Sequence, residues 1–141
     1  MATNKINRYV YEILEKVGST KKKVDKITIL KQNDSAALRT VLQGCYHPEI
    51  KLDLPEGAPP YKACEEYNAP SNLMRKWKDF GYFTGSQTQR IGRVKMETMF
   101  IQLLEAIHPQ DAKIVLQMKD KKPFKGISAA VVKEAFPTIL P

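Results

Sequence analysis

The chain of 141 residues contains few cysteines and no long apolar run. Its two cysteines, Cys45 and Cys64, form no CxxC motif, which excludes a disulfide-rich scaffold and is typical of a reducing compartment. No apolar run approaches the roughly 18 residues that a membrane-spanning helix needs, and the first residues do not resemble a signal peptide. We therefore expect a cytoplasmic protein without a membrane partner.

The sequence also lacks the common catalytic and nucleotide-binding motifs, namely the P-loop, GxGxxG, HExxH and GxSxG. Glu65 with Glu66, or Asp111 alone, could act as a general acid or base only inside a cleft, and positions on the surface of helices explain them better. A zinc site made of Cys45, His47 and Cys64 has no obvious fourth ligand. We predict a protein that is not an enzyme and that binds no metal or cofactor.

Positive charge, in contrast, is abundant. Lysine and arginine number 23 against 15 acidic residues, which gives a net charge of +8 and an isoelectric point near 9.5. The excess lies at the two ends, because basic and acidic residues number 9 and 5 in residues 1–50, 6 and 5 in 51–90, and 8 and 5 in 91–141. Such a balance indicates a polyanionic partner, either a nucleic acid or an acidic membrane surface.

Apolar residues at steps of three and four predict three helices in the first third of the chain. Gly18 stops the first helix, Ser19 can cap the second, and Asp34 can cap the third. Their predicted inner faces are formed by Ile6, Tyr9, Val10, Ile13, Leu14 and Val17, by Val24, Ile27 and Leu30, and by Leu38, Val41, Leu42 and Cys45.

The rest of the chain shows a proline-rich connector at 47–60, with at most a short extended piece at 50–54, followed by further helices. We expect a short helix at 61–67, one from a Ser71 cap to Phe80, a long buried helix at 89–107, one starting at Pro109, and one between a Ser128 cap and Pro137. The predicted inner positions are Leu73, Met74 and Trp77, then Val94, Met96, Phe100, Leu103, Leu104 and Ile107, then Ala112, Val115 and Leu116, and finally Val131, Val132, Ala135 and Phe136. The sequence therefore predicts an all-α protein, with residues 1–141 forming a single compact domain of about seven or eight short helices.

Two lysine-rich segments, 18–23 and 119–128, each combine a turn, a hydroxyl group and the start of a predicted helix. Unpaired backbone N–H groups and the macrodipole make a helix start favourable for anions, whereas lysines placed there cost about 0.3–1 kcal/mol each unless an anion is near. The segments therefore indicate binding of backbone phosphates, although a solvated basic loop is the other interpretation. The candidate nucleic-acid-binding residues are Ser19, Thr20, Lys21, Lys22, Lys23, Lys26, Lys119, Lys121, Lys122, Lys125, Gly126 and Ser128.

Lysine is a flexible point charge that suits phosphate better than the bidentate recognition of guanine. The predicted binding therefore follows shape and charge, with little dependence on base sequence. A second set of basic residues in the middle of the chain could extend the contact, although solvated helix faces explain each of them better. This set is Arg75, Lys76, Lys78, Arg90 and Arg93.

The order of these pieces resembles a known family, the N-terminal DNA-binding domain of the ATP-dependent DNA ligases of T-even bacteriophages. The likeness is specific at the two ends of the chain, in EILEKVGSTKKKVDKITILKQN (12–33) and MKDKKPFKGISAAVVKEAFPTILP (118–141). Between them, SAALRTVLQGCYHPEIKLDLP (35–55) continues it in outline. The resemblance implies an all-helical domain that lies against the minor groove and grips the backbone on either side of a nick.

By this resemblance, contacts with duplex DNA are expected at both ends of the chain, through Ser19, Thr20, Lys21 and Lys22 and through Lys119, Lys125, Gly126 and Ser128. The sequence departs from the family in two respects. Lys119 stands before Asp120 where the family usually has an arginine, and the Lys-x-Asp-Gly adenylation motif of the ligases does not occur. We therefore expect no ligase activity.

The leading hypothesis is a non-enzymatic, phage-type protein that binds the backbone of double-stranded DNA in the cytoplasm of an infected bacterial cell. It requires the two lysine-rich segments to lie on a common, accessible side of the folded chain. The alternative is an adaptor or structural component of a phage or host protein assembly, for replication, transcription or the virion, that keeps the fold but not DNA binding. A membrane-surface protein ranks below both, because no predicted helix combines a basic face with exposed Trp, Phe and Leu.

Overall fold

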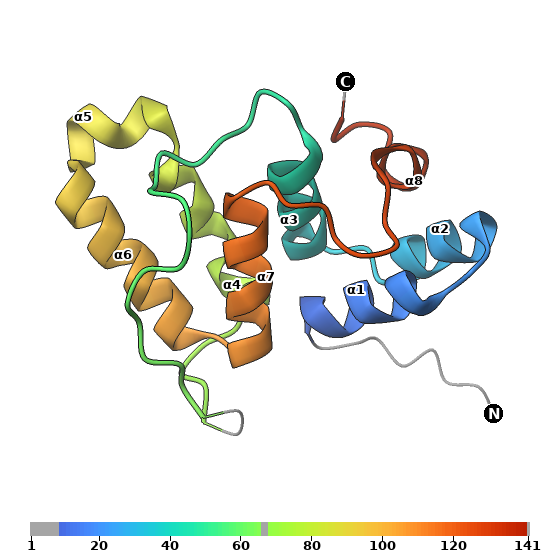
Figure 1. Cartoon of the computed structure of the whole chain (residues 1–141), viewed down its shortest axis with the longest axis horizontal. Helices are drawn as coiled ribbons and strands as arrows, with labels where there is room; N and C mark the ends of the chain where they lie inside the picture. Colours follow the sequence, from blue (N-terminus) through green and yellow to red (C-terminus); the bar gives the residue numbers. More distant parts are fainter. Residues whose placement is uncertain (1–8, 66–67, 141) are drawn as a thin grey trace.

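The computed structural model describes residues 9–65 and 68–140 (Figure 1). Over these residues the chain forms eight α-helices and two short 3-10 helices, and its only β interaction is an isolated bridge between Leu52 and Thr84. The predicted all-α class is therefore confirmed, as is the expected number of helices. The α-helices are α1 (Val10–Ser19), α2 (Lys23–Gln32), α3 (Ala36–Tyr46), α4 (Leu73–Lys76), α5 (Thr88–Ile91), α6 (Arg93–Ala106), α7 (Pro109–Lys119) and α8 (Ala129–Ala135), and the 3-10 helices are η1 (Trp77–Phe83) and η2 (Gly85–Gln87).

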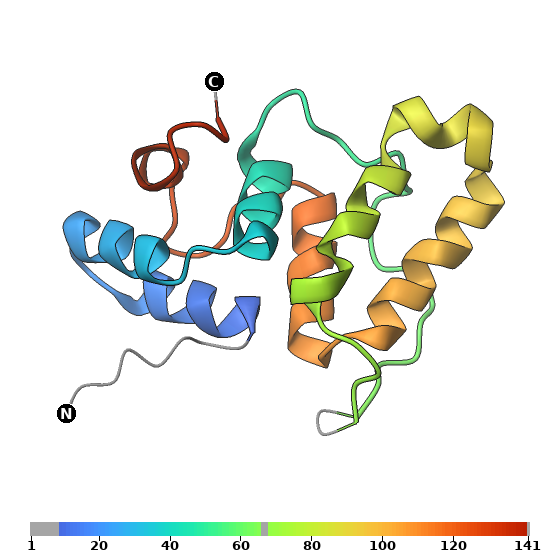
Figure 2. The ribbon, with the colours of Figure 1, turned by 180° about the vertical axis from the view of Figure 1, so that it is seen from behind.

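Helix α7 lies at the centre of the molecule and packs against α1, α3 and α6. Helix α2 packs against both α1 and α8, although α8 follows it by about a hundred residues. Seen from the front and from behind, α2 and α8 lie at one end of the molecule, and α5 with the start of α6 lies at the other (Figures 1 and 2). Helices from the first and the last part of the described chain are thus brought together on one side of α7.

The apolar core agrees with most of the predicted inner faces. In α6, Met96, Phe100, Leu103 and Leu104 are buried as predicted, and Phe100 meets Phe83 edge to face with ring centroids 5.4 Å apart. Two predicted core residues are wrong, because Val24 is 73% exposed and Val94 is 81% exposed. Each is the second residue of its helix.

The helix starts agree only in part with the predicted caps. The Ser128 hydroxyl accepts a hydrogen bond from the backbone N–H of Val131 as predicted, and Pro109 occupies the first turn of α7 as predicted. The α3 cap is Ser35 instead of Asp34, whose carboxylate pairs with Arg39. The α4 cap is Asn72 instead of Ser71. Both errors are shifts of one residue between neighbouring side chains that can each accept the capping bond.

The long helix predicted at 89–107 is interrupted at Gly92. The φ of Gly92 is 88°, a backbone conformation that glycine adopts readily and that is strained for other residues. Residues 61–65 of the helix predicted at 61–67 are not helical, and residues 66–67 lie outside the described residues. Here the backbone N–H of Lys62 donates to Glu105 Oε2 at 2.8 Å and Cys64 Sγ donates to the Ile107 carbonyl. The segment is therefore held along the end of α6 by tertiary hydrogen bonds. Ile6, a predicted inner residue, also lies outside the described part.

Helix α1 receives its N-terminal cap from another helix, because its own N-cap residue, Tyr9, makes no side-chain capping bond. Oδ1 of Asp111, in the first turn of α7, accepts a hydrogen bond from the backbone N–H of Tyr11 at 2.9 Å. Asp111 is 1% exposed, so the interpretation of this residue as part of a helix surface was wrong. Burial raises the pKa of its carboxyl to about 6, while the hydrogen bonds from the Tyr11 and Val10 backbone act in the opposite direction.

Candidate nucleic-acid interface

The two lysine-rich segments meet through a pair of glycines. A Cβ atom on Gly18 would lie 2.5 Å from the Lys125 carbonyl oxygen, and one on Gly126 would lie 2.6 Å from the Gly18 carbonyl oxygen. Gly126 also has a φ of 74°, in the left-handed region. Residues 125–128 of the second segment are therefore in backbone contact with the first segment, which agrees with the expected common side for this part of the second segment. We call residues 18–23 together with 125–128 the basic junction.

Two of the predicted lysines fasten the junction together. The Lys26 ammonium donates to the carbonyl oxygen of Gly126, across a hundred residues of chain. Lys23 forms an ion pair with Glu134 of α8 at 3.2 Å, with both side chains about half exposed. Exposed pairs of this kind add little stability, so the Lys26 bond and the packing of α2 on α8 hold the two segments in place.

The turn between α1 and α2 differs from the predicted one. Ser19 is the last residue of α1, and its hydroxyl donates to the Lys16 carbonyl at 3.0 Å, as does the Thr20 hydroxyl at 2.7 Å. The prediction that Ser19 caps α2 is therefore wrong. The N-cap of α2 is Lys22, which provides no side-chain acceptor for the N–H groups of the first turn.

Three lysines of the junction are exposed and available. Within the described residues, the ammonium groups of Lys21, Lys22 and Lys125 form neither an ion pair nor a hydrogen bond. Gly126 and Ser128 are also exposed, as is Lys122 in the loop that leads to the junction. The junction thus presents exposed cations beside the start of α2, which has no side-chain cap.

Lys119 does not belong to this surface. Its side chain is 1% exposed, and its Nζ donates to the Pro55 carbonyl at 2.7 Å and to Asp120 Oδ1 at 2.5 Å. Asp120 in turn accepts a hydrogen bond from the backbone N–H of Gly57. The Lys119–Asp120 pair therefore fastens the proline-rich connector to the end of α7, and the expectation that Lys119 faces DNA does not agree with its burial.

Lys121 is also turned inward. Its Nζ donates to the carbonyl oxygens of Gly44, His47 and Ile50 at 2.8, 2.6 and 2.5 Å. These groups lie at and beyond the end of α3, where helix carbonyls lack partners within the helix. Its backbone φ is 55°, which is uncommon for a residue other than glycine. All three donors of the ammonium are thus occupied, and Lys121 acts as a structural cap instead of a phosphate ligand.

Two residues of the second basic set lie far from the junction. Arg90 and Arg93 lie in α5 and at the start of α6, at the opposite end of the molecule from α2 and α8 (Figures 1 and 2). Arg93 approaches Asp53 at 3.7 Å, and Lys76 approaches Asp79 at 3.8 Å. These contacts fit the interpretation of solvated helix faces.

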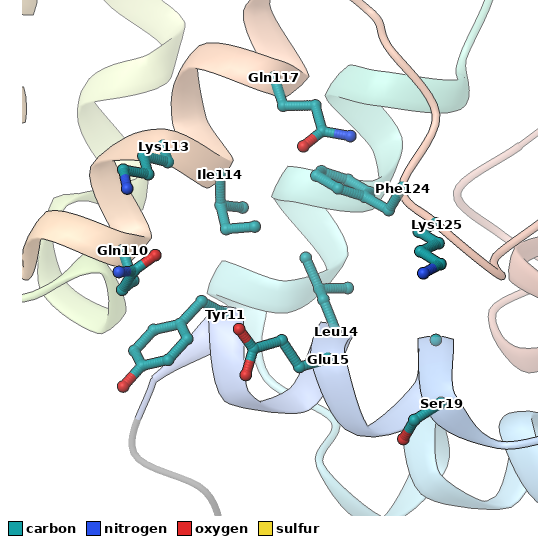
Figure 3. Close-up of a pocket in the computed structure, with 11 residues that line it drawn as sticks. Tyr11, Leu14, Glu15, Ser19, Gln110, Lys113, Ile114, Gln117, Phe124 and Lys125 are labelled. Carbon is teal, nitrogen blue, oxygen red and sulfur yellow. The ribbon is translucent and has the colours of Figure 1, made fainter.

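A groove that the sequence did not reveal adjoins the junction. It lies between α1, α7 and the segment around Phe124, and has a volume of about 390 Å³ (Figure 3). Ser19 and Lys125 line the groove as well as the junction, so the two are continuous. A signal was present in the sequence, because Gln110, Lys113 and Gln117 recur on one face of α7, but nothing indicated which helix would face them. The lining residues are Tyr11, Leu14, Glu15, Gly18, Ser19, Gln110, Lys113, Ile114, Gln117, Phe124 and Lys125.

The two cysteines lie apart from the basic junction in the sequence and form no disulfide. Cys45 is buried, its Sγ donates to the Lys122 carbonyl, and burial raises its pKa to about 11. Among residues 9–65 and 68–140, no three or more His, Cys, Asp or Glu side chains are grouped so that they could hold a metal ion. No helix of the described part is long and apolar enough to cross a membrane.

Comparison with known proteins places the chain in a family. The family model described as a family of unknown function, DUF6433, matches residues 13–124, which is most of the chain. The chain therefore belongs to this family. No curated protein matches it. The matched residues include the α1–α2 turn and the whole of α7, whereas Lys125 to Ser128 follow the matched region.

Proposed function

We propose that this member of the DUF6433 family is a non-enzymatic DNA-binding protein that holds the phosphate backbone of a duplex at the basic junction. The observation that carries the proposal is the backbone contact of Gly18 with Lys125 and Gly126. It places Lys125 beside the turn that bears Lys21 and Lys22, and all three ammonium groups are exposed and without partners in the described structure. Exposed cations that come from distant parts of the chain and form no ion pair in the described structure favour an anionic ligand.

The chemistry of the junction favours phosphate over base edges. Its free cations are lysines, which contact phosphates as point charges, and the first-turn N–H groups of α2 have no side-chain acceptor. The junction itself carries no arginine that could read guanine in a bidentate manner. Binding is therefore expected to vary little with base sequence and strongly with salt.

A fluorescence anisotropy titration with duplex, nicked and single-stranded DNA at several salt concentrations tests the proposal. Lys21, Lys22, Lys122 and Lys125 provide about four phosphate contacts, so the logarithm of the binding constant should fall against the logarithm of salt concentration with a slope of about −4. This is shallower than the slope that all the lysines of the two segments would give, because Lys119 and Lys121 are withdrawn. Absence of binding to every DNA at low salt would rule the proposal out.

Substitution of single lysines by glutamate tests where on the protein DNA binds. Lys21→Glu and Lys125→Glu should each weaken binding to all duplex sequences alike. Lys95→Glu is the matched control, since Lys95 is exposed near the start of α6, at the other end of the molecule. Equal weakening by all three substitutions would show that net charge acts without a defined site.

One observation favours the adaptor as a second candidate function. Val24 is 73% exposed in the first turn of α2, directly after the lysines of the junction, and a phosphate backbone has no use for an apolar side chain there. A protein partner with an acidic and apolar surface could cover both. Capture of partners that survive nuclease treatment and are lost in Val24→Ser would support this role, whereas loss of all partners after nuclease would favour DNA.

A further inference from the structure

The groove beside the basic junction differs from the junction in having an apolar base. Leu14 and Phe124 at its base are 4% and 5% exposed, and Ile114 of α7 is half-buried next to them. In Figure 3 the amide of Gln117 and the carboxylate of Glu15 stand at its rim, and Lys113 and Lys125 flank it on opposite sides. The groove thus offers an apolar floor, hydrogen-bonding groups above it and cations at its sides.

We propose that this groove receives an unpaired nucleobase of the strand whose phosphates lie on the basic junction. The inference rests on the proposed function and adds to it a preferred form of DNA, namely duplex beside a single-stranded stretch. Since Ser19 and Lys125 belong to both surfaces, a strand held at the junction brings its next nucleotide to the mouth of the groove.

The size of the groove suits a single planar group. Its volume of about 390 Å³ lies near the lower end of the range of roughly 300–1,000 Å³ found for small-molecule sites. The base would lie on the apolar floor while its polar edge faces Gln110, Gln117 and Glu15. Amides and carboxylates are the side chains that pair with the amino and ring nitrogen groups of bases. The side-chain oxygen of Gln117 remains available to accept a hydrogen bond from the base. Its side-chain Nε2 donates to the Pro123 carbonyl oxygen.

The charges favour a base over an acidic peptide. An acidic peptide in the groove would bring carboxylates against Glu15, whereas a base has no charge and presents amino groups that Glu15 can accept. The anionic part of a nucleotide is its phosphate, which lies outside the base and can reach Lys113 or Lys125. The distribution of one acid at the rim and cations at the sides therefore matches a nucleotide.

Three labelled DNAs of one sequence test the inference by fluorescence anisotropy at a fixed salt concentration: a blunt duplex, the duplex with a short single-stranded overhang, and the duplex with an overhang of abasic sugars. The abasic overhang has the same phosphates and lacks only the bases. We expect the base-bearing overhang to bind on the order of ten-fold more tightly than the other two. Equal affinity for the two overhangs would overturn the inference and leave the proposed function intact, whereas no binding to any of the three would overturn both.

Variants of the groove identify the site. Ile114→Gln should remove the preference for the base-bearing overhang and leave binding of the blunt duplex unchanged, and Gln110→Ala, on the rim, should reduce the preference even if Ile114→Gln folds poorly. Lys95→Ala is the control and should keep the preference. A preference that survives in both groove variants would overturn the inference. Saturable binding of an acidic, leucine-containing peptide that is lost in Ile114→Gln would overturn it in favour of a protein ligand.

Discussion

The backbone N–H of Tyr11 donates a hydrogen bond of 2.9 Å to Oδ1 of Asp111, a residue one hundred positions further along the chain. The bond places a buried carboxylate against the first turn of α1, where unpaired N–H groups favour negative charge. It also joins the first turn of α1 to the first turn of α7, and these two helices form walls of the groove.

Stability should therefore depend on pH through Asp111. Its folded pKa of about 6 lies above the ordinary value of 3.8, so between about pH 4 and pH 6 the folded state binds more protons than the unfolded state. The free energy of unfolding should fall as pH rises through this window, by at most about 3 kcal/mol. Urea unfolding at several pH values measures it. Asp111→Asn should flatten this part of the profile and the exposed control Asp25→Asn should not, while an unchanged profile in Asp111→Asn would assign the dependence to another group.

Substitution of Gly18 should be destabilising despite its place in a helix. Alanine is the better helix former by about 1 kcal/mol, but its Cβ would lie 2.5 Å from the Lys125 carbonyl oxygen, and backbone clashes of this kind typically cost about 1–3 kcal/mol. Gly18→Ala should lower both the midpoint of denaturant unfolding and the affinity for DNA. Gly81→Ala is the control, because no atom lies within 4 Å of the added Cβ. If Gly18→Ala instead raises the free energy of unfolding, the close contact between the two segments does not contribute to stability.

Two lysines of the same predicted segment should respond in opposite ways. Lys119→Met removes the ion-pair partner of Asp120, whose side chain is only 9% exposed, and leaves the Pro55 carbonyl without its donor, which should cost about 3–5 kcal/mol of stability. Lys125→Met should change stability by no more than about 0.5 kcal/mol and weaken DNA binding. Thermal unfolding and anisotropy separate the two effects. If Lys119→Met is as stable as the parent protein but no longer binds DNA, Lys119 contacts DNA directly.

The neighbouring pair Lys121 and Lys122 offers a similar comparison. Lys121→Met removes a donor from three carbonyl oxygens at and beyond the end of α3, of which only that of His47 keeps another donor within the described residues, the Ile50 N–H, and unfolding should become easier by about 1–3 kcal/mol. Lys122→Met, on an exposed side chain, should unfold like the parent protein. Hydrogen exchange of the α3 amides gives a second measurement, since faster exchange in Lys121→Met alone is expected.

The helices and most of the core could be predicted from the sequence because both depend on the spacing of apolar residues. Met96, Phe100 and Leu104 follow the periodicity of α6 and are buried. The same rule failed for Val24 and Val94, because periodicity identifies the face of a helix and not how far its neighbours extend along the axis. The interruption at Gly92 could not be predicted from the sequence, because an isolated glycine within a helical pattern is often tolerated.

The sequence predicted which segments form the candidate site, but not which of their lysines remain exposed. The composition of the two lysine-rich segments was visible, and their meeting at Gly18 and Gly126 agrees with the prediction. Which ammonium groups remain exposed depends on carbonyl oxygens that come from elsewhere in the chain. Lys121 finds three of them at the end of α3, whereas Lys125 finds none in the described structure. No local pattern distinguishes the two residues.

The pairing of α2 with α8 has a consequence for the order of folding. Helix α2 buries only Leu30 completely, and α8 is one of the two helices it packs against. During synthesis α2 must therefore wait for about a hundred further residues before that partner emerges from the ribosome. Since long loops must close before such contacts form, the chain should fold more slowly than helical bundles whose neighbours are adjacent in sequence. In the nascent chain, the lysines of α2 would be exposed to polyanions, the ribosomal RNA among them, before the junction exists.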